Sequence, residues 1–227
     1  MQLSIRPPWS LSPGDSAELA VVIDVLRATT TACFLCARGT EVIVLESCGD
    51  LASLGPPENY TVFSELALPP GWRHVDNSPA VARTLDVVGT PVLVTTNGTR
   101  AIHAALGVAS AVALASFANI GAVAAWIRAR APQTLVLVPA GFDPRREARY
   151  EDDVCARALE GLVRGDADPV TVADAAAGCW NDARVKRRLD GNPALRADVE
   201  LALAPNSLSS VPVALRRGEH VVIHPGS

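Results

Sequence analysis

Lysine is almost absent from this sequence. Lys186 is the only lysine among 20 basic residues, so recognition of an anion would depend on the planar guanidinium groups of arginine. The chain also carries no excess of positive charge, because 24 acidic residues against 20 basic ones give a formal net charge of -4. A chain of this charge has no field strong enough to recruit a polyanion, and we expect no nonspecific binding of nucleic acid.

The sequence also lacks the usual signs of secretion and of a disulfide framework. Residues 1–9 hold Arg6 and two prolines but no basic region followed by an apolar run, so a cytoplasmic protein is expected. The five cysteines form an odd set without a framework spacing, which is typical of reduced thiols. Cys33 and Cys36 have the spacing of a redox pair but lie inside an expected helix, which favours a structural role.

One long stretch without charge resembles a membrane span. Ala101–Ile127 contains no Asp, Glu, Lys or Arg, and it is long enough to cross a bilayer. Its composition of mostly Ala, Gly, Ser and Val indicates instead a helix as far as Gly107, a short strand that ends at Ala115, and a second helix that ends at Arg128. No contact with a membrane is expected.

Apolar runs of strand length alternate with helical stretches, which indicates an α/β fold. With 49% hydrophobic residues the chain can bury one core, so a single domain over residues 1–227 is expected. Leu19–Ile23 and Leu135–Val138 are continuously apolar, as is typical of interior strands covered on both faces. We therefore predict a three-layer α/β/α architecture with a largely parallel central sheet. The expected strands are Leu19–Val25, Glu41–Leu45, Tyr60–Phe63, Pro91–Thr95, Ala111–Ala115 and Thr134–Pro139.

Two stretches and the C-terminal end depart from this alternation. Residues 49–77 are rich in Gly and Pro and are interpreted as an irregular excursion over the sheet. Residues 169–210 are expected to be mainly helical. Val211–Leu215 and His220–Ile223 flank a turn and predict a terminal hairpin, in which Pro212 would confine its strand to an edge of the sheet.

The first candidate site follows the strand that ends near Asp24. Ligands of open α/β sheets bind beyond the carboxyl ends of the strands. Here an aspartate, Arg27 and three threonines, Thr29 to Thr31, lead into a helix, and free amides at a helix start favour an anion. In the alternative interpretation these residues only cap the helix, and Arg27 neutralises Asp24.

The second candidate site follows the strand Pro91–Thr95. Asn97-Gly98 permits positive φ, so successive backbone N–H groups could converge on one oxyanion, with Thr96, Thr99 and Arg100 as side-chain donors. A phosphate or a sulfonate would suit such a pocket. The alternative is a hairpin turn, which would need a strand after Gly98, but the residues that follow are of helical type.

The third candidate site joins Ala140-Gly141, after another strand, to acids at the start of a helix. Glu151, Asp152 and Asp153 could simply compensate the helix dipole. Carboxylate oxygens are also what Mg²⁺ requires, with one or two acids from the protein and a substrate phosphate completing the shell. Asp24 together with one of these acids could form such a site.

These motifs resemble those of the 2-phosphosulfolactate phosphatase family, both in their residues and in their order along the chain. The likeness runs from about Ala20 to Gly161, and Asp24-Val25-Leu26-Arg27-Ala28-Thr29 and Thr95-Thr96-Asn97-Gly98-Thr99-Arg100 are its most specific blocks. The resemblance implies an α/β, Mg²⁺-dependent phosphatase that converts (2R)-2-phospho-3-sulfolactate to 3-sulfolactate and phosphate, in coenzyme M biosynthesis. Its motifs assign catalytic roles to Asp24, Arg27 and Arg100, substrate binding to Asn77, Ser78, Thr96, Asn97, Gly98 and Thr99, and metal binding to Asp24, Glu151 and Asp152.

Some positions depart from the family pattern and bear on the substrate. Asp76 replaces the usual glycine before Asn77-Ser78-Pro79, and Leu66 replaces an arginine after Ser64-Glu65. The His-Gly-Arg stretch of the family corresponds here to Asp182–Leu189. Within it, Arg184 to Arg188 are interpreted as a solvated helix face, with a lid over an anionic substrate as the alternative.

The residues leave several points of function open. The nucleophile is either Asp24 or a metal-bound water, and Leu26 stands where a haloacid-dehalogenase type phosphatase carries its second aspartate, which disfavours that mechanism. A different function class is a protein without catalysis that binds a phosphorylated or sulfonated metabolite as a sensor. A phosphatase for another small anionic phosphoester is a third option. The Ala-rich helices are compatible with a homodimer.

Overall fold

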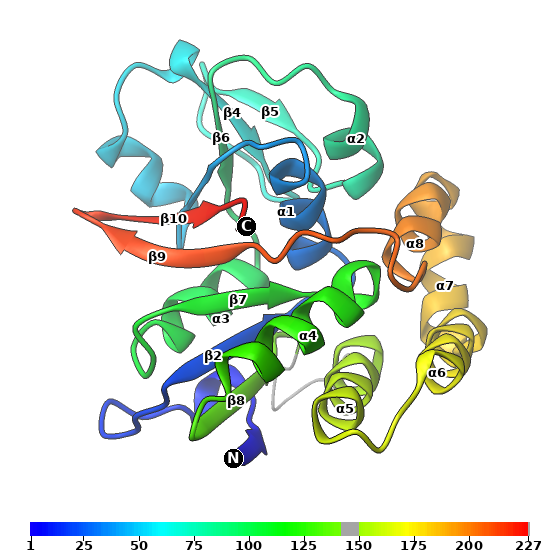
Figure 1. Ribbon diagram of the computed structural model, residues 1–227. Coiled ribbons are helices and arrows are strands. Elements are labelled where there is room, and N and C mark those ends of the chain that lie inside the picture. Colours follow the sequence, from blue (N-terminus) through cyan, green and yellow to red (C-terminus); the bar gives the residue numbers. More distant parts are fainter. Residues whose placement is uncertain (142–149, 227) are drawn as a thin grey trace.

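A mixed sheet of ten strands forms the centre of the computed structural model, which describes residues 1–141 and 150–226 (Figure 1). Its strands follow the order β1-β8-β2-β7-β9-β10-β3-β6-β4-β5. Most neighbouring strands are parallel, which confirms the predicted α/β class. The strands are β1 (Gln2–Ile5), β2 (Leu19–Ile23), β3 (Val42–Val44), β4 (Tyr60–Phe63), β5 (Arg73–Val75), β6 (Thr90–Leu93), β7 (Val112–Ala115), β8 (Thr134–Pro139), β9 (Val213–Arg217) and β10 (His220–His224).

The hairpin β9–β10 lies in the middle of the sheet and separates two parallel groups of strands. β9 pairs with β7 on one side, and β10 pairs with β3 on the other, both antiparallel. The predicted hairpin is confirmed, but the expectation that Pro212 would place its strand at an edge is wrong. Pro212 precedes the first residue of β9, so its missing N–H falls outside the strand, and its carbonyl accepts a hydrogen bond from Leu114 (2.9 Å).

Helices cover both faces of the sheet, as the three-layer prediction requires. Val22 and Leu114 belong to the core under α1, α2 and α3, whereas Val21 and Leu137 belong to the core under α4, α5 and α6. Neighbouring residues of β2 therefore point into different cores. The α-helices of the described residues are α1 (Ala28–Cys36), α2 (Pro79–Thr84), α3 (Gly98–Ala105), α4 (Ile120–Arg130), α5 (Tyr150–Arg164), α6 (Pro169–Asn181), α7 (Ala183–Gly191) and α8 (Arg196–Ala202).

The uncharged stretch Ala101–Ile127 folds as expected, into most of α3, the strand β7 and most of α4. Within residues 1–141 and 150–226, no helix combines the length and the apolarity that a bilayer span would need. The edge strands β1 and β5 were not expected. Both are short, and β5 contains Arg73 and His74, so neither forms the apolar run by which the interior strands are found.

The two unusual segments take different forms. Residues 49–77 are irregular only in part, because they contain β4 and β5 as well as the short 3-10 helix Pro57–Asn59. Residues 169–210 are mainly helical, as predicted, and carry α6, α7 and α8 along one side of the sheet (Figure 1).

The cysteine pair on α1 is buried. Burial raises the pKa of Cys33 well above its ordinary value, and it raises the pKa of Cys36 to about 12. Thiols that ionise this reluctantly are poor nucleophiles and poor redox groups. The structural interpretation of Cys33 and Cys36 is therefore supported.

Candidate active site

Asp24 follows β2 directly and is buried, with 4% of its surface exposed. The threonines after it hold the turn into α1. The hydroxyl of Thr29 accepts a hydrogen bond from the Asp24 amide (2.9 Å) and donates one to the carbonyl of Ala115 on β7 (2.7 Å), while Thr30 donates to the carbonyl of Val25 (2.7 Å). Neither threonine caps a free amide of α1, and the helix has no side-chain cap, so the capping interpretation is wrong for these two residues. They instead fix the turn, and Asp24 stands at the strand end.

Gly98, the first residue of α3, packs directly against Asp24 and the first residue of α1. A Cβ atom on Gly98 would lie 2.4 Å from Cβ of Ala28 and 2.7 Å from Oδ2 of Asp24. The expectation of positive φ at this turn is wrong, because Asn97 has a φ of -127° and the φ of Gly98 is not positive. Glycine is required here by close approach, and two helix starts meet beside one carboxylate.

The residues that follow Asn97 differ in their contacts. Thr99 is buried, its hydroxyl accepts a hydrogen bond from the Thr95 amide, and its amide donates to the Thr95 hydroxyl (both 3.1 Å). These bonds fix the end of β6 to the start of α3. Arg100 is exposed on α3 and forms no ion pair or hydrogen bond with any residue that the structure describes.

Asp152 of α5 ties the third strand end to the first. Its Oδ1 accepts a hydrogen bond from the amide of Val25 (2.7 Å), and its Oδ2 accepts one from the amide of Gly141 (2.9 Å). The side chain is 1% exposed, so both bonds to the carboxylate are shielded from water. The three predicted strand ends therefore meet, and Asp152 acts as a clamp between two of them.

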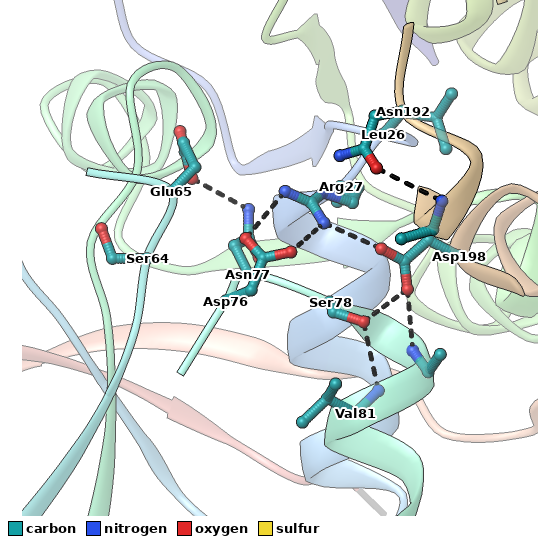
Figure 2. Close-up of polar contacts among 12 residues, drawn as sticks. Leu26, Arg27, Ser64, Glu65, Asp76, Asn77, Ser78, Val81, Asn192 and Asp198 are labelled. Carbon is teal, nitrogen blue, oxygen red and sulfur yellow. Dashed lines mark hydrogen bonds and ion pairs between the residues drawn. The ribbon is translucent and has the colours of Figure 1, made fainter. Parts of the chain in front are cut away.

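Arg27 lies between two carboxylates (Figure 2). Its Nη1 donates to Asp76 (2.6 Å) and Asp198 (2.8 Å), and its Nη2 donates to the other oxygen of Asp76 (3.0 Å). Burial by itself would lower the pKa of Arg27, but its hydrogen bonds to Asp76 and Asp198 raise that pKa above the ordinary value. Arg27 thus pairs with these two acids, whereas the capping alternative assigned it to Asp24.

Glu65, between β4 and β5, joins the Asn77 and Thr96 segments. Its Oε1 accepts hydrogen bonds from the amide (2.7 Å) and the hydroxyl (2.9 Å) of Thr96, and its Oε2 accepts one from Nδ2 of Asn77 (3.3 Å). Asn77 is 3% exposed, and its Oδ1 has no hydrogen-bond partner among the described residues. This buried oxygen can accept a donor or a cation. Ser78 instead donates to Asp198 (2.5 Å) and caps α2.

Arg188 of α7 reaches the same place from the C-terminal helices. Its Nη1 donates to Glu151 of α5 (3.1 Å), and its Nη2 donates to the carbonyl of Leu26 (3.4 Å). The interpretation of this arginine run as a solvated face is therefore wrong for Arg188, although it holds for its exposed neighbour Arg187.

These groups line one pocket. Of the predicted residues, it contains Asp24, Arg27, Asn77, Thr96 and Asn97. Four predicted catalytic or substrate-binding residues do not line it: Arg100, Ser78, Gly98 and Thr99. Neither do the predicted metal ligands Glu151 and Asp152, which bind Arg188 and two backbone amides. The full lining is Asp24, Leu26, Arg27, Glu65, Asn77, Thr96, Asn97 and Arg188.

The pocket and the residues directly behind it hold more carboxylates than guanidinium groups. Asp24 and Glu65 line it together with Arg27 and Arg188. Behind these, Asp76 and Asp198 bind Arg27, and Glu151 binds Arg188. In the part of the chain that the structure describes, the site thus sets five carboxylates against two guanidinium groups.

Oxygen groups in the pocket fit a hard divalent cation. Asp24 and Glu65 supply carboxylates, and Asn77 supplies a buried amide oxygen without a partner. Residues 1–141 and 150–226 contain no cluster of three or more His, Cys, Asp or Glu side chains suited to a metal. Mg²⁺ does not require such a cluster, because one or two carboxylates with water and a phosphate suffice.

Sequence reasoning missed Glu65 and Asp198 as parts of the site, and it placed Arg188 near the substrate only in the lid alternative. Glu65 stands out in the sequence only as the neighbour of Leu66, and no local pattern indicates its contact with Thr96. Arg188 lies among exposed basic residues of α7, and Asp198 is one of several acids in the C-terminal helices. Only the fold brings these residues to the strand ends.

The clamp formed by Asp152 predicts a large difference between neighbouring acids. We expect Asp152→Asn to lower the free energy of unfolding by about 2 kcal/mol, because one buried amide loses its charged acceptor. Asp153→Asn should cost less than about 0.5 kcal/mol, because Asp153 is partly exposed and its one ion pair among the described residues is with Arg157, one helical turn away. Urea denaturation of both variants measures the difference, and equal losses would show that Asp152 is not a clamp.

The family implied by the sequence motifs is shown by comparison with known proteins. The sequence model of the family described as 2-phosphosulpholactate phosphatase matches residues 8–216. A relative from Symbiobacterium thermophilum, named probable 2-phosphosulfolactate phosphatase, is 38% identical over 166 residues, which cover 70% of this chain and 69% of the relative. One of the same name from Gloeobacter violaceus is 33% identical over 186 residues, covering 78% and 76%. The family model matches most of the chain, and the relatives agree with it. The chain therefore belongs to the 2-phosphosulpholactate phosphatase family of phosphoric monoester hydrolases, in accord with the order of its motifs and the pocket at its strand ends.

Proposed function

We propose that the chain is a Mg²⁺-dependent phosphatase that hydrolyses (2R)-2-phospho-3-sulfolactate to 3-sulfolactate and phosphate. The observation that carries this proposal is the meeting of Asp24 with the starts of α1 and α3 in a pocket that also holds Arg27 and Arg188. The names of the relatives support the identity of the substrate, and the residues of the pocket support hydrolysis of a phosphoester.

The two helix starts give the phosphoryl group a place to bind. Backbone amides at helix N-termini carry partial positive charge and point toward an oxyanion. Leu26 and Asn97, which precede α1 and α3, both line the pocket. The absence of a side chain at Gly98 lets these two N-termini approach the same phosphate. The phosphoryl group would thus bind next to Asp24.

The excess of carboxylates in the described part of the site supports the binding of a divalent cation. In the described part of the site, Asp24 and Glu65 line the pocket, and the charges of Arg27 and Arg188 are already paired with three acids behind it. We therefore expect a phosphoester that also carries a carboxylate and a sulfonate to bind together with a cation. Mg²⁺ would be held by Asp24, Glu65 and Oδ1 of Asn77. When bound, it would supply charge that stabilises the phosphoryl oxygens.

The chain's own residues would then orient and stabilise the reacting group. Arg27 and Arg188 present guanidinium forks, which bind oxyanions in two-point contacts and oppose the charge that develops on transfer. Asp24 is either the nucleophile or the carboxylate that holds the attacking water. Leu26 lines the pocket where a second catalytic aspartate would be needed for the haloacid-dehalogenase mechanism, so proton transfer would fall to another group.

Phosphate release tests this function directly. Purified protein is incubated with Mg²⁺ and a panel of phosphoesters that carry a carboxylate, a sulfonate, both or neither. We expect release from 2-phospho-3-sulfolactate, loss of release in EDTA, recovery on adding Mg²⁺, and a loss of at least about 100-fold in Asp24→Asn. Activity that persists in EDTA would contradict the role of Mg²⁺. Tight binding of the substrate without release would indicate the sensor function instead.

Arg188 predicts a selective effect on substrates with further anionic groups. In Arg188→Gln we expect KM to rise about tenfold for phosphoesters that carry a carboxylate or sulfonate, because one charge-assisted contact is lost. KM for a simple aryl phosphate should change little. Arg187→Gln is the matched control, since Arg187 is the exposed neighbour on the same helix. Equal behaviour of the two variants would exclude Arg188 from substrate binding.

A further inference from the structure

Asp198 is a buried acid that is distant in sequence from the pocket residues but contacts one of them, Arg27. It lies on α8 with 3% of its surface exposed. Its Oδ2 accepts a hydrogen bond from Nη1 of Arg27 (2.8 Å), and its Oδ1 accepts hydrogen bonds from the Ser78 hydroxyl (2.5 Å) and the Ala80 amide (3.1 Å). Figure 2 shows the carboxylate between Arg27 and the start of α2.

The two acids that hold Arg27 differ in how firmly they can do so. The side chain of Asp76 is 53% exposed, whereas that of Asp198 is 4% exposed. An exposed ion pair is weakened by water and salt, while a buried carboxylate with several donors stays in place. Asp198 is also fixed from its other side by Ser78 and Ala80. It is therefore the rigid support of the Arg27 guanidinium.

This support leaves part of Arg27 available to a ligand. The contacts with Asp76 and Asp198 use both hydrogens of Nη1 and one of Nη2. Nε and the second hydrogen of Nη2 have no partner among the residues that the structure describes, and Arg27 lines the pocket. These two donors form the other edge of the guanidinium, which can bind two oxygens of one anion.

We propose that Asp198 is a positioning residue, which holds Arg27 so that its Nε–Nη2 edge meets oxygens of the bound phosphoester. The inference rests on the proposed phosphatase function. It makes the C-terminal helices part of the active site, because α8 carries the group that orients an arginine at the end of β2. Asp198 itself touches no substrate and transfers no proton.

A double-mutant cycle tests the proposal with phosphate release as the readout. We expect Asp198→Asn to lower kcat/KM about tenfold, because a misdirected Arg27 loses one charge-assisted contact. Arg27→Ala should lower it further, and the double variant should match Arg27→Ala alone, because Asp198 acts only through Arg27. Glu200→Gln is the matched control: Glu200 is an exposed acid of the same helix, paired with Arg196. It should leave kcat/KM unchanged.

Rescue by guanidinium ion provides a second, independent measurement. Millimolar guanidinium should restore activity to Arg27→Ala, where the carboxylate of Asp198 can hold the added cation, but not to the double variant. This comparison decides the question even if Asp198→Asn alone does not fold, since the double variant buries no unpaired charge. Two results would overturn the positioning role. One is a double variant whose loss of kcat/KM equals the product of the two single losses, and the other is guanidinium rescue of the double variant as well as of Arg27→Ala. A wild-type protein that releases no phosphate would refute the proposed function instead.

Discussion

The close approach of Gly98 to Asp24 is the constraint on which the site depends. It places the end of β2 and the end of β6 side by side, although five pairings separate these strands across the sheet. The hairpin β9–β10 separates the two parallel groups, and the helices that leave them meet at Ala28 and Gly98. A carboxylate and two helix N-termini thereby share one small volume, which is the arrangement that a phosphate and a cation require together.

The charges around this contact are arranged in pairs. Each arginine of the pocket is held by at least one acid that does not line it: Arg27 by Asp198, and Arg188 by Glu151. Such pairing fixes the direction of a guanidinium fork. Among the described residues of the site, acids still outnumber arginines. Under the proposed function, a multiply anionic substrate is expected to bind together with a cation. The same acids thus orient the two arginines and support the proposed role of Mg²⁺.

The sequence allowed the architecture, the interior strands and the three strand-end motifs to be predicted, because continuous apolar runs and polar strand ends are local signals. It did not reveal why the ends meet. Gly98 was expected to supply positive φ, whereas its role is to leave room for Asp24. Arg188 reaches the pocket, and Asp198 reaches Arg27, only through packing of the C-terminal helices, and no short pattern encodes such a long-range contact.

The most direct test of the account is the phosphatase activity of Gly98→Ala beside that of Gly178→Ala. A Cβ on Gly98 would press on Ala28 and Asp24, whereas a Cβ on Gly178, an exposed glycine of α6, would meet no atom within 4 Å. The account predicts a loss of at least about 100-fold for Gly98→Ala and unchanged activity for Gly178→Ala, because only the former displaces charge-stabilising groups. A fully active Gly98→Ala variant would contradict the claim that Asp24 and the start of α3 act on one phosphate.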